Sequence, residues 1–235
     1  MKSVKIDWLP LQCSGGSLSH FQDRKLPVST GCVDLDEILG GGWPRHEVSY
    51  IQGDAGAGKS SLCASSVISH LENGGDLGII LTIAGEHPLP GFSDRVHGKN
   101  AVILTLSLLE ASSPVLELLD SARDSILVVD DLTSLSHSVR GVTWKPVKEF
   151  LAKIRPHIRY DTTILLVNQV RDTESGMVGA LAHNYATQSS TVCVHMAKQE
   201  QDSSGLSSVV TVLTPPELRN RTCEIRIRYG YGVVG

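Results

Sequence analysis

The chain lacks the features that would suit it to a membrane, to export or to a structural metal. None of its apolar runs reaches the roughly 18 residues that a membrane-spanning helix requires. The N-terminal stretch MKSVKIDWLPLQ contains no continuous apolar segment of the kind found in a secretory signal. The five cysteines are scattered, odd in number and never in C-x-x-C spacing. We therefore expect a protein of a reducing compartment, without a disulfide framework, a zinc site or a membrane anchor.

A strong positive charge is also missing. Lys and Arg number 21 against 25 Asp and Glu, which gives a net charge of −4, so the chain as a whole is no electrostatic trap for nucleic acid. Any contact with DNA must come from a local patch or from a partner. With 41% hydrophobic and 20% charged residues, the 235-residue chain has the composition of one ordinary α/β domain of the larger sort.

One segment points directly to phosphate chemistry. Residues 53–60, GDAGAGKS, have the form G-x-x-x-x-G-K-[ST], in which glycines let successive backbone N–H groups face phosphate oxygens. Lys59 would bridge the outer two phosphates, and the Ser60 hydroxyl would take one position on Mg²⁺. A β-rich stretch precedes the loop and a helical pattern follows it, as such a loop requires. The predicted nucleotide-binding residues are Gly53, Asp54, Ala55, Gly56, Ala57, Gly58, Lys59, Ser60 and Ser61.

From residue 29 onward, strand and helix patterns alternate as a mainly parallel sheet demands. Buried strands are expected over residues 47–52, 76–84, 100–108, 125–131 and 162–170. Helices are expected over residues 60–73, 113–122 (with Ser113 as the N-cap) and 143–158. Short strands without intervening helices then follow over residues 190–197, 206–214 and 223–230. The prediction is an α/β core, residues 29–235, with a mainly parallel sheet and C-terminal antiparallel strands, after a short N-terminal extension of residues 1–28.

Residues 29–62, STGCVDLDEILGGGWPRHEVSYIQGDAGAGKSSL, resemble the start of the ATPase core in the RecA-type recombinase family. The likeness is greatest to the recombinase paralogues of eukaryotes and the archaeal RadA- and RadB-like proteins. ILVVDD resembles the Walker B strand of that family, which would give Asp130 to Mg²⁺ through water. LLVNQV is similar to the strand that places a glutamine, here Gln169, near the terminal phosphate. The resemblance implies a RecA-like P-loop NTPase core that binds ATP and Mg²⁺.

The resemblance also indicates the residue on which hydrolysis depends. In this family a glutamate polarises the attacking water, and Glu86 in LTIAGEHPLPGFSDRV has the matching position. Such a carboxylate can act as general base beside the Walker B acid. Pro88 and Pro90 depart from the family pattern, and Glu86 could instead be a solvated loop residue. Three readings therefore stay open: a weak DNA-dependent ATPase, a non-catalytic nucleotide-bound subunit, and a KaiC-like ATPase, which LDEILGGGWP also resembles.

DNA and protein partners follow only from the resemblance. Family loops that contact single-stranded DNA correspond to segments containing Arg140 and Arg171, and the second segment also carries Asp172 and Glu174. Since phosphate contact depends on Lys and Arg, neither loop is strongly basic. Phe21 is followed by QDR rather than by the family's x-x-Ala docking sequence, so we expect no long self-filament. The resemblance implies homologous-recombination DNA repair in a hetero-oligomer of related paralogue subunits, in the nucleus of a eukaryote or otherwise in the cytoplasm.

Overall fold

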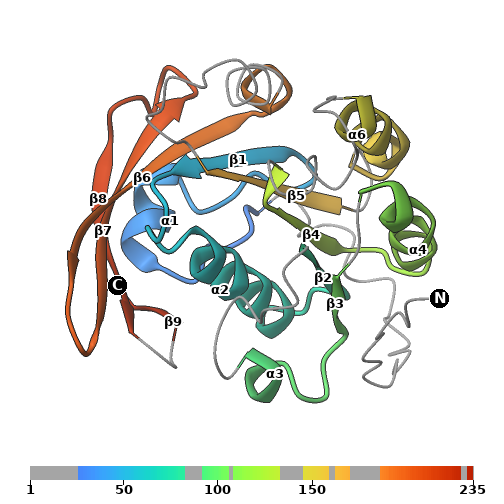
Figure 1. Cartoon of the computed structure of the whole chain (residues 1–235), viewed down its shortest axis with the longest axis horizontal. Coiled ribbons are helices and arrows are strands. Elements are labelled where there is room, and N and C mark those ends of the chain that lie inside the picture. Colours follow the sequence, from blue (N-terminus) through green and yellow to red (C-terminus); the bar gives the residue numbers. More distant parts are fainter. Residues whose placement is uncertain are drawn as a thin grey trace.

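The computed structural model describes residues 26–82, 92–105, 108–132, 145–158, 162–169, 186–228 and 232–234. The strands are β1 (Val48–Gly53), β2 (Leu77–Thr82), β3 (Ala101–Thr105), β4 (Ser125–Asp130), β5 (Thr162–Gln169), β6 (Val192–Gln201), β7 (Gly205–Thr214), β8 (Thr222–Arg228) and β9 (Gly232–Val234). The labelled helices are α1 (Val33–Leu39), α2 (Lys59–Glu72), α3 (Phe92–Arg95), α4 (Leu108–Asp120) and α6 (Lys145–Ile158). Within these ranges the strands form one sheet in the order β3-β2-β4-β5-β1-β6-β7-β8-β9 (Figure 1).

The sheet changes character at β6. Strands β1 to β6 are parallel, and Ile51 of β1 lies between Val167 of β5 and Val194 of β6. Strands β6, β7, β8 and β9 are joined by antiparallel pairing. Because parallel strands are covered on both faces, they read as nearly continuous apolar runs, and every residue of β1 and β2 is buried. The predicted parallel core with C-terminal antiparallel strands is therefore confirmed.

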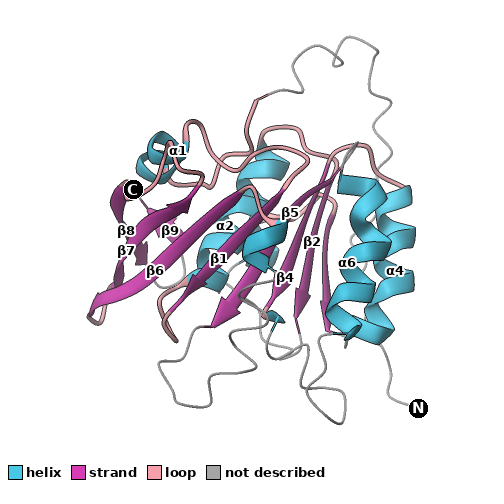
Figure 2. Ribbon diagram, turned by 90° about the horizontal axis from the view of Figure 1, so that it is seen from above, coloured by secondary structure: helices cyan, strands magenta, loops and turns pink. Residues whose placement is uncertain are grey.

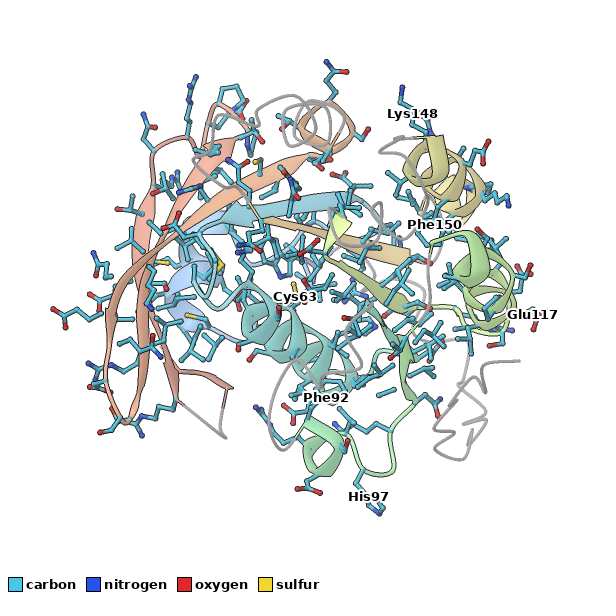
Figure 3. The ribbon with its side chains drawn as sticks, viewed as in Figure 1. Cys63, Phe92, His97, Glu117, Lys148 and Phe150 are labelled. Atoms are coloured by element: carbon cyan, nitrogen blue, oxygen red, sulfur yellow. The ribbon has the colours of Figure 1, made fainter. Side chains whose placement is uncertain are left out.

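Helices cover the two faces of the parallel region and make two hydrophobic cores. Ile51 belongs to the core beneath α2, which also includes α1 and the inner side of β6 to β8, whereas Tyr50 belongs to the core beneath α4 and α6 (Figure 2). Figure 3 shows Phe150 of α6 directed toward α4, and Cys63 of α2 in the interior; both are 1% exposed. The helix patterns that placed residues of α2 and α6 on buried sides are thus confirmed for Leu62, Val67, Ile68, Leu71, Phe150, Leu151 and Ile154.

The start of α4 differs from the prediction. This helix begins at Leu108, so Ser113 lies inside it and the expected N-cap is wrong. Pro114 within the helix lacks the N–H that would bond the preceding turn, at a cost of about 3 kcal/mol. Val115 and Leu119 of the same helix are buried, and burial of a side chain of this size contributes about 1.5–3 kcal/mol. Tertiary burial therefore overrides the local helix-breaking signal.

At the end of the sheet opposite the phosphate-loop sequence, Asp124 joins three segments. Arg45 Nη1 lies 2.6 Å from both carboxylate oxygens of Asp124. His70, in the last turn of α2, places Nε2 3.1 Å from the backbone carbonyl oxygen of Asp124. The segment before β1, the end of α2 and the start of β4 are thus held together by polar contacts. No helix in the described part of the chain is long and apolar enough to cross a membrane.

We expect the free energy of unfolding to fall as the pH drops below about 6.5. Burial lowers the pKa of His70, and Arg45 adds to this effect while Asp124 and Asp76 oppose it. The unfolded chain then takes up the proton first, so the stability that neutral His70 contributes is complete above its unfolded pKa and is lost toward its lower folded pKa. The slope reaches at most about 1.4 kcal/mol per pH unit. Urea unfolding of wild type and His70→Gln between pH 5 and 8 tests this; equal pH dependence in both proteins would contradict it.

Candidate nucleotide-binding site

A pocket of about 400 Å³ opens at the carboxyl ends of β1, β4 and β5. One side consists of the phosphate loop, defined as residues 53–60, and the first turn of α2. Asp130 and Asp131 reach the pocket from the end of β4, and Gln169 reaches it from the end of β5. Because the carboxyl ends of parallel strands meet at one edge of a sheet, residues far apart in the sequence converge there.

The backbone of the phosphate loop is shaped by glycine. Gly56 and Gly58 have φ angles of +70° and +85°, in the left-handed region that other residues adopt only at a cost. Helix α2 starts directly after Gly58, and no side chain of the described residues caps that end. Its first amides carry the positive end of the helix dipole, an arrangement that suits phosphate oxygens.

Lys59 is a cation held inside this loop. Its side chain is 8% exposed, and Nζ donates to the carbonyl oxygens of Gly53 at 3.0 Å and Asp54 at 2.6 Å. Burial lowers the pKa of the ammonium group, and the carboxylates of Asp130, Asp131 and Asp54 oppose that change. A buried cation between backbone carbonyls and an acidic pair is chemically suited to binding a phosphate chain.

Ser60 and Asp130 supply hard oxygen atoms beside Lys59. The Ser60 hydroxyl is hydrogen-bonded to the Asp130 carboxylate. Burial raises the pKa of Asp130, with Asp131 acting in the same direction, while the Ser60 hydrogen bond and the Lys59 charge oppose it. Mg²⁺ prefers carboxylate and hydroxyl oxygens, completed by phosphate oxygens and water, so the residues present fit this metal.

The structure brings most of the predicted site residues together. Lys59, Ser60, Asp130 and Gln169 line one pocket, with Ala55, Gly56, Gly58 and Ser61. Gly53, Asp54 and Ala57 are not among its lining residues and contact the C-terminal strands instead. Glu86, Arg140 and Arg171 lie outside the described residues, so their predicted roles stay predictions.

The far wall of the pocket was not predicted. Leu206 of β7 and Ile227 and Arg228 of β8 line it, as does Gln201 of β6. Alternation in CEIRIR indicates one apolar face of β8, but nothing in that pattern says which element the face covers. Asp131, the second acid of VVDD, also lines the pocket, and the sequence pattern assigns it no role.

Comparison with known proteins bears on the family. A family model described as "ATPase: KaiC" matches residues 28–98. The protein RecA of Bdellovibrio bacteriovorus is 28% identical over 160 residues, which cover 61% of this chain and 42% of that protein. The DNA repair and recombination protein RadB of Methanoculleus marisnigri is 29% identical over 187 residues, covering 66% of this chain and 79% of that protein. Together these matches support a RecA-type recombinase or ATPase family for this chain.

The RecA-type fold is also seen in a solved structure. The crystal structure of a KaiC-like protein from Pyrococcus horikoshii matches with a TM-score of 0.66 and 15% identity, over 88% of this chain and 97% of that one. The chain spans under half the length of the RecA proteins from Bdellovibrio bacteriovorus and Prochlorococcus marinus, 42% and 46% respectively. RecA-type relatives imply nucleotide binding, typically with Mg²⁺, at a loop of this kind.

Proposed function

We propose that this chain binds ATP with Mg²⁺ and hydrolyses it slowly in a DNA-dependent manner, as one subunit of a hetero-oligomer in homologous-recombination repair. The observation that carries the proposal is the convergence of Lys59, Ser60, Asp130 and Gln169 on one pocket beside a glycine-shaped loop. A cation, a hydroxyl, a carboxylate and an amide in that arrangement match the groups that phosphoryl transfer requires.

Each residue has a distinct task in the proposal. The amides of the phosphate loop and Lys59 bind the phosphates, Ser60 and Asp130 hold Mg²⁺, and Gln169 reaches the terminal phosphate. When bound, Mg²⁺ neutralises charge on the phosphate oxygens. Glu86 takes the proton of the attacking water as general base. Leu206 and Ile227 offer an apolar surface for the nucleoside on the far wall.

The role in DNA repair rests on the relatives. Two of them are RecA and a protein named for DNA repair and recombination. Arg140 and Arg171 are the proposed contacts to single-stranded DNA, directly or beside a partner's surface. The proposed partners are related paralogue subunits rather than a long filament of this chain. The proposed location is the nucleus in a eukaryote and the cytoplasm otherwise.

A second candidate is a KaiC-like ATPase that acts outside recombination. The family model over residues 28–98 and the structural neighbour from Pyrococcus horikoshii both favour it. Such a protein would use the same pocket for ATP, so the pocket does not discriminate between the two functions. The response of ATP turnover to single-stranded DNA does.

We expect single-stranded DNA to raise ATP turnover severalfold and Glu86→Gln to lower the stimulated rate by about tenfold or more. A general base typically contributes a factor of about 10²–10⁴, less when another step limits turnover. The measurement is phosphate release by purified protein with and without single-stranded DNA, alongside ATP binding, which Glu86→Gln should retain. Glu72→Gln, an exposed glutamate at the end of α2, is the matched control.

The other possible outcomes distinguish the alternative functions and test the role of Glu86. Turnover that DNA leaves unchanged favours the KaiC-like ATPase. Tight ATP binding with no turnover in either protein, even with DNA and related subunits present, favours the non-catalytic subunit. Stimulated turnover that persists in Glu86→Gln removes this glutamate from the mechanism.

A further inference from the structure

The phosphate loop rests on the C-terminal antiparallel strands through specific polar contacts. Ser208 of β7 donates its hydroxyl to the backbone carbonyl oxygen of Ala57 at 3.0 Å, and both residues are fully buried. At the start of the loop, the N–H of Asp54 donates to the carbonyl oxygen of Met196 in β6 at 3.1 Å. The loop is thus tied to the sheet at both ends, and Ser208 is the side chain that holds the end next to α2.

The Ser208 contact sets the direction of a peptide group. In a planar trans peptide the carbonyl of one residue and the N–H of the next point in opposite directions. Holding the Ala57 carbonyl toward β7 therefore turns the N–H of Gly58 away from β7. Gly58 itself lines the pocket.

Apolar side chains also pack against this peptide, but they do not fix its orientation. A β-carbon built at Gly58 would lie 1.9 Å from Cδ1 of Ile227 and 3.3 Å from Cδ2 of Leu206, so β7 and β8 pack closely against the loop. Packing of this kind is non-directional. A hydrogen bond depends on the angle between donor and acceptor, so it selects one orientation of the peptide.

We propose that Ser208 is a positioning residue for nucleotide binding: its hydroxyl orients the Ala57–Gly58 peptide so that the Gly58 N–H is available to a phosphate oxygen. The inference rests on the proposed function, because it assigns that amide to a nucleotide phosphate. The chain also offers a matched control one residue away. Ser207 lies on the same strand with its side chain on the opposite face, where its hydroxyl bonds to Glu224 of β8.

The first test compares ATP affinities, measured by titration calorimetry in the presence of Mg²⁺. Ser208→Ala is expected to weaken ATP binding about fivefold, the effect of one buried hydrogen bond between neutral groups. Ser208→Cys fills similar space with a weak donor and should behave like the alanine variant, whereas Ser208→Thr should restore affinity. Ser207→Ala should leave affinity unchanged. Circular dichroism and thermal unfolding verify that each variant is folded.

Amide hydrogen exchange without nucleotide separates this inference from the proposed function. Amides of residues 53–60 should exchange faster in Ser208→Ala than in wild type and Ser207→Ala. If wild type binds no ATP, the proposed function fails, while faster exchange in Ser208→Ala alone still supports control of the loop by Ser208. Unchanged ATP affinity, unchanged exchange, or equal losses in the Ser207 and Ser208 variants would overturn the proposal.

Discussion

Replacing Lys59 by alanine is expected to weaken ATP binding by about a hundredfold or more. The ammonium group belongs to the phosphate loop itself and lies between two backbone carbonyls, near the carboxylates of Asp130 and Asp131. A charge-assisted hydrogen bond contributes about 1.5–3 kcal/mol, and without Lys59 the two carboxylates would also repel a phosphate chain with less opposition. Calorimetric titration of ATP into wild type and variant, with Mg²⁺ present, measures the difference.

The control for Lys59→Ala should remove one positive charge from the protein at a position outside the pocket. Lys153→Ala removes one exposed ammonium group from α6, so it reports any effect of net charge alone. It should bind ATP as wild type does. If Lys59→Ala retains wild-type affinity while remaining folded, the pocket is not a phosphate site and the proposed function is lost.

A methyl group added at Gly53 should lower the free energy of unfolding by about 4 kcal/mol or more. Few single substitutions have so large an effect. Gly53 pairs with Met196 of β6, and a β-carbon at Gly53 would lie 2.0 Å from the Met196 backbone carbonyl oxygen. That oxygen cannot move without separating β1 from β6. Since domains are stable by only about 5–15 kcal/mol, Gly53→Ala should be partly or wholly unfolded. Urea unfolding followed by circular dichroism gives the magnitude.

Gly56 provides the comparison within the same loop. Its φ of +70° is unfavourable for alanine, but a β-carbon there meets no atom within 4 Å. Gly56→Ala should therefore cost only the backbone term, about 1–2 kcal/mol. Both variants replace glycine by alanine, and they differ in the space available for the added methyl group. Equal losses of stability would therefore show that contact with β6 is not the decisive factor at Gly53.

Local sequence was sufficient for one wall of the candidate site. The residues of GDAGAGKS are contiguous, so their spacing alone predicts the loop and the roles of Lys59 and Ser60. Asp130 and Gln169 followed from the resemblance of ILVVDD and LLVNQV to strands of the family, and the structure brings the carboxyl ends of these parallel strands to one edge. Alternation of strand and helix patterns predicted the parallel part of the sheet, and the short strands without intervening helices predicted its C-terminal antiparallel part.

The opposite wall depends on pairing between distant segments, which no local pattern encodes. Leu206 and Ile227 belong to alternating strands that would suit any half-buried sheet. Only the pairing of β6 beside β1 brings them against the loop. Ser207 and Ser208 look equivalent in sequence, although one hydroxyl bonds to Ala57 and the other to Glu224. The prediction of Ser113 as an N-cap failed for a related reason, since burial of side chains in α4 outweighed the local effect of Pro114.

The central place of β1 in the sheet has a consequence for how the protein is made. Ile51 lies opposite Val167 and Val194, so the strand before the phosphate loop acquires both of its neighbours from much later in the chain. Contacts of such high sequence separation slow folding, because a long loop must close before they form. During synthesis a ribosome releases the GDAGAGKS sequence long before β6 to β8 exist to shape it. ATP should therefore stabilise the finished sheet by mass action rather than guide the nascent chain toward it.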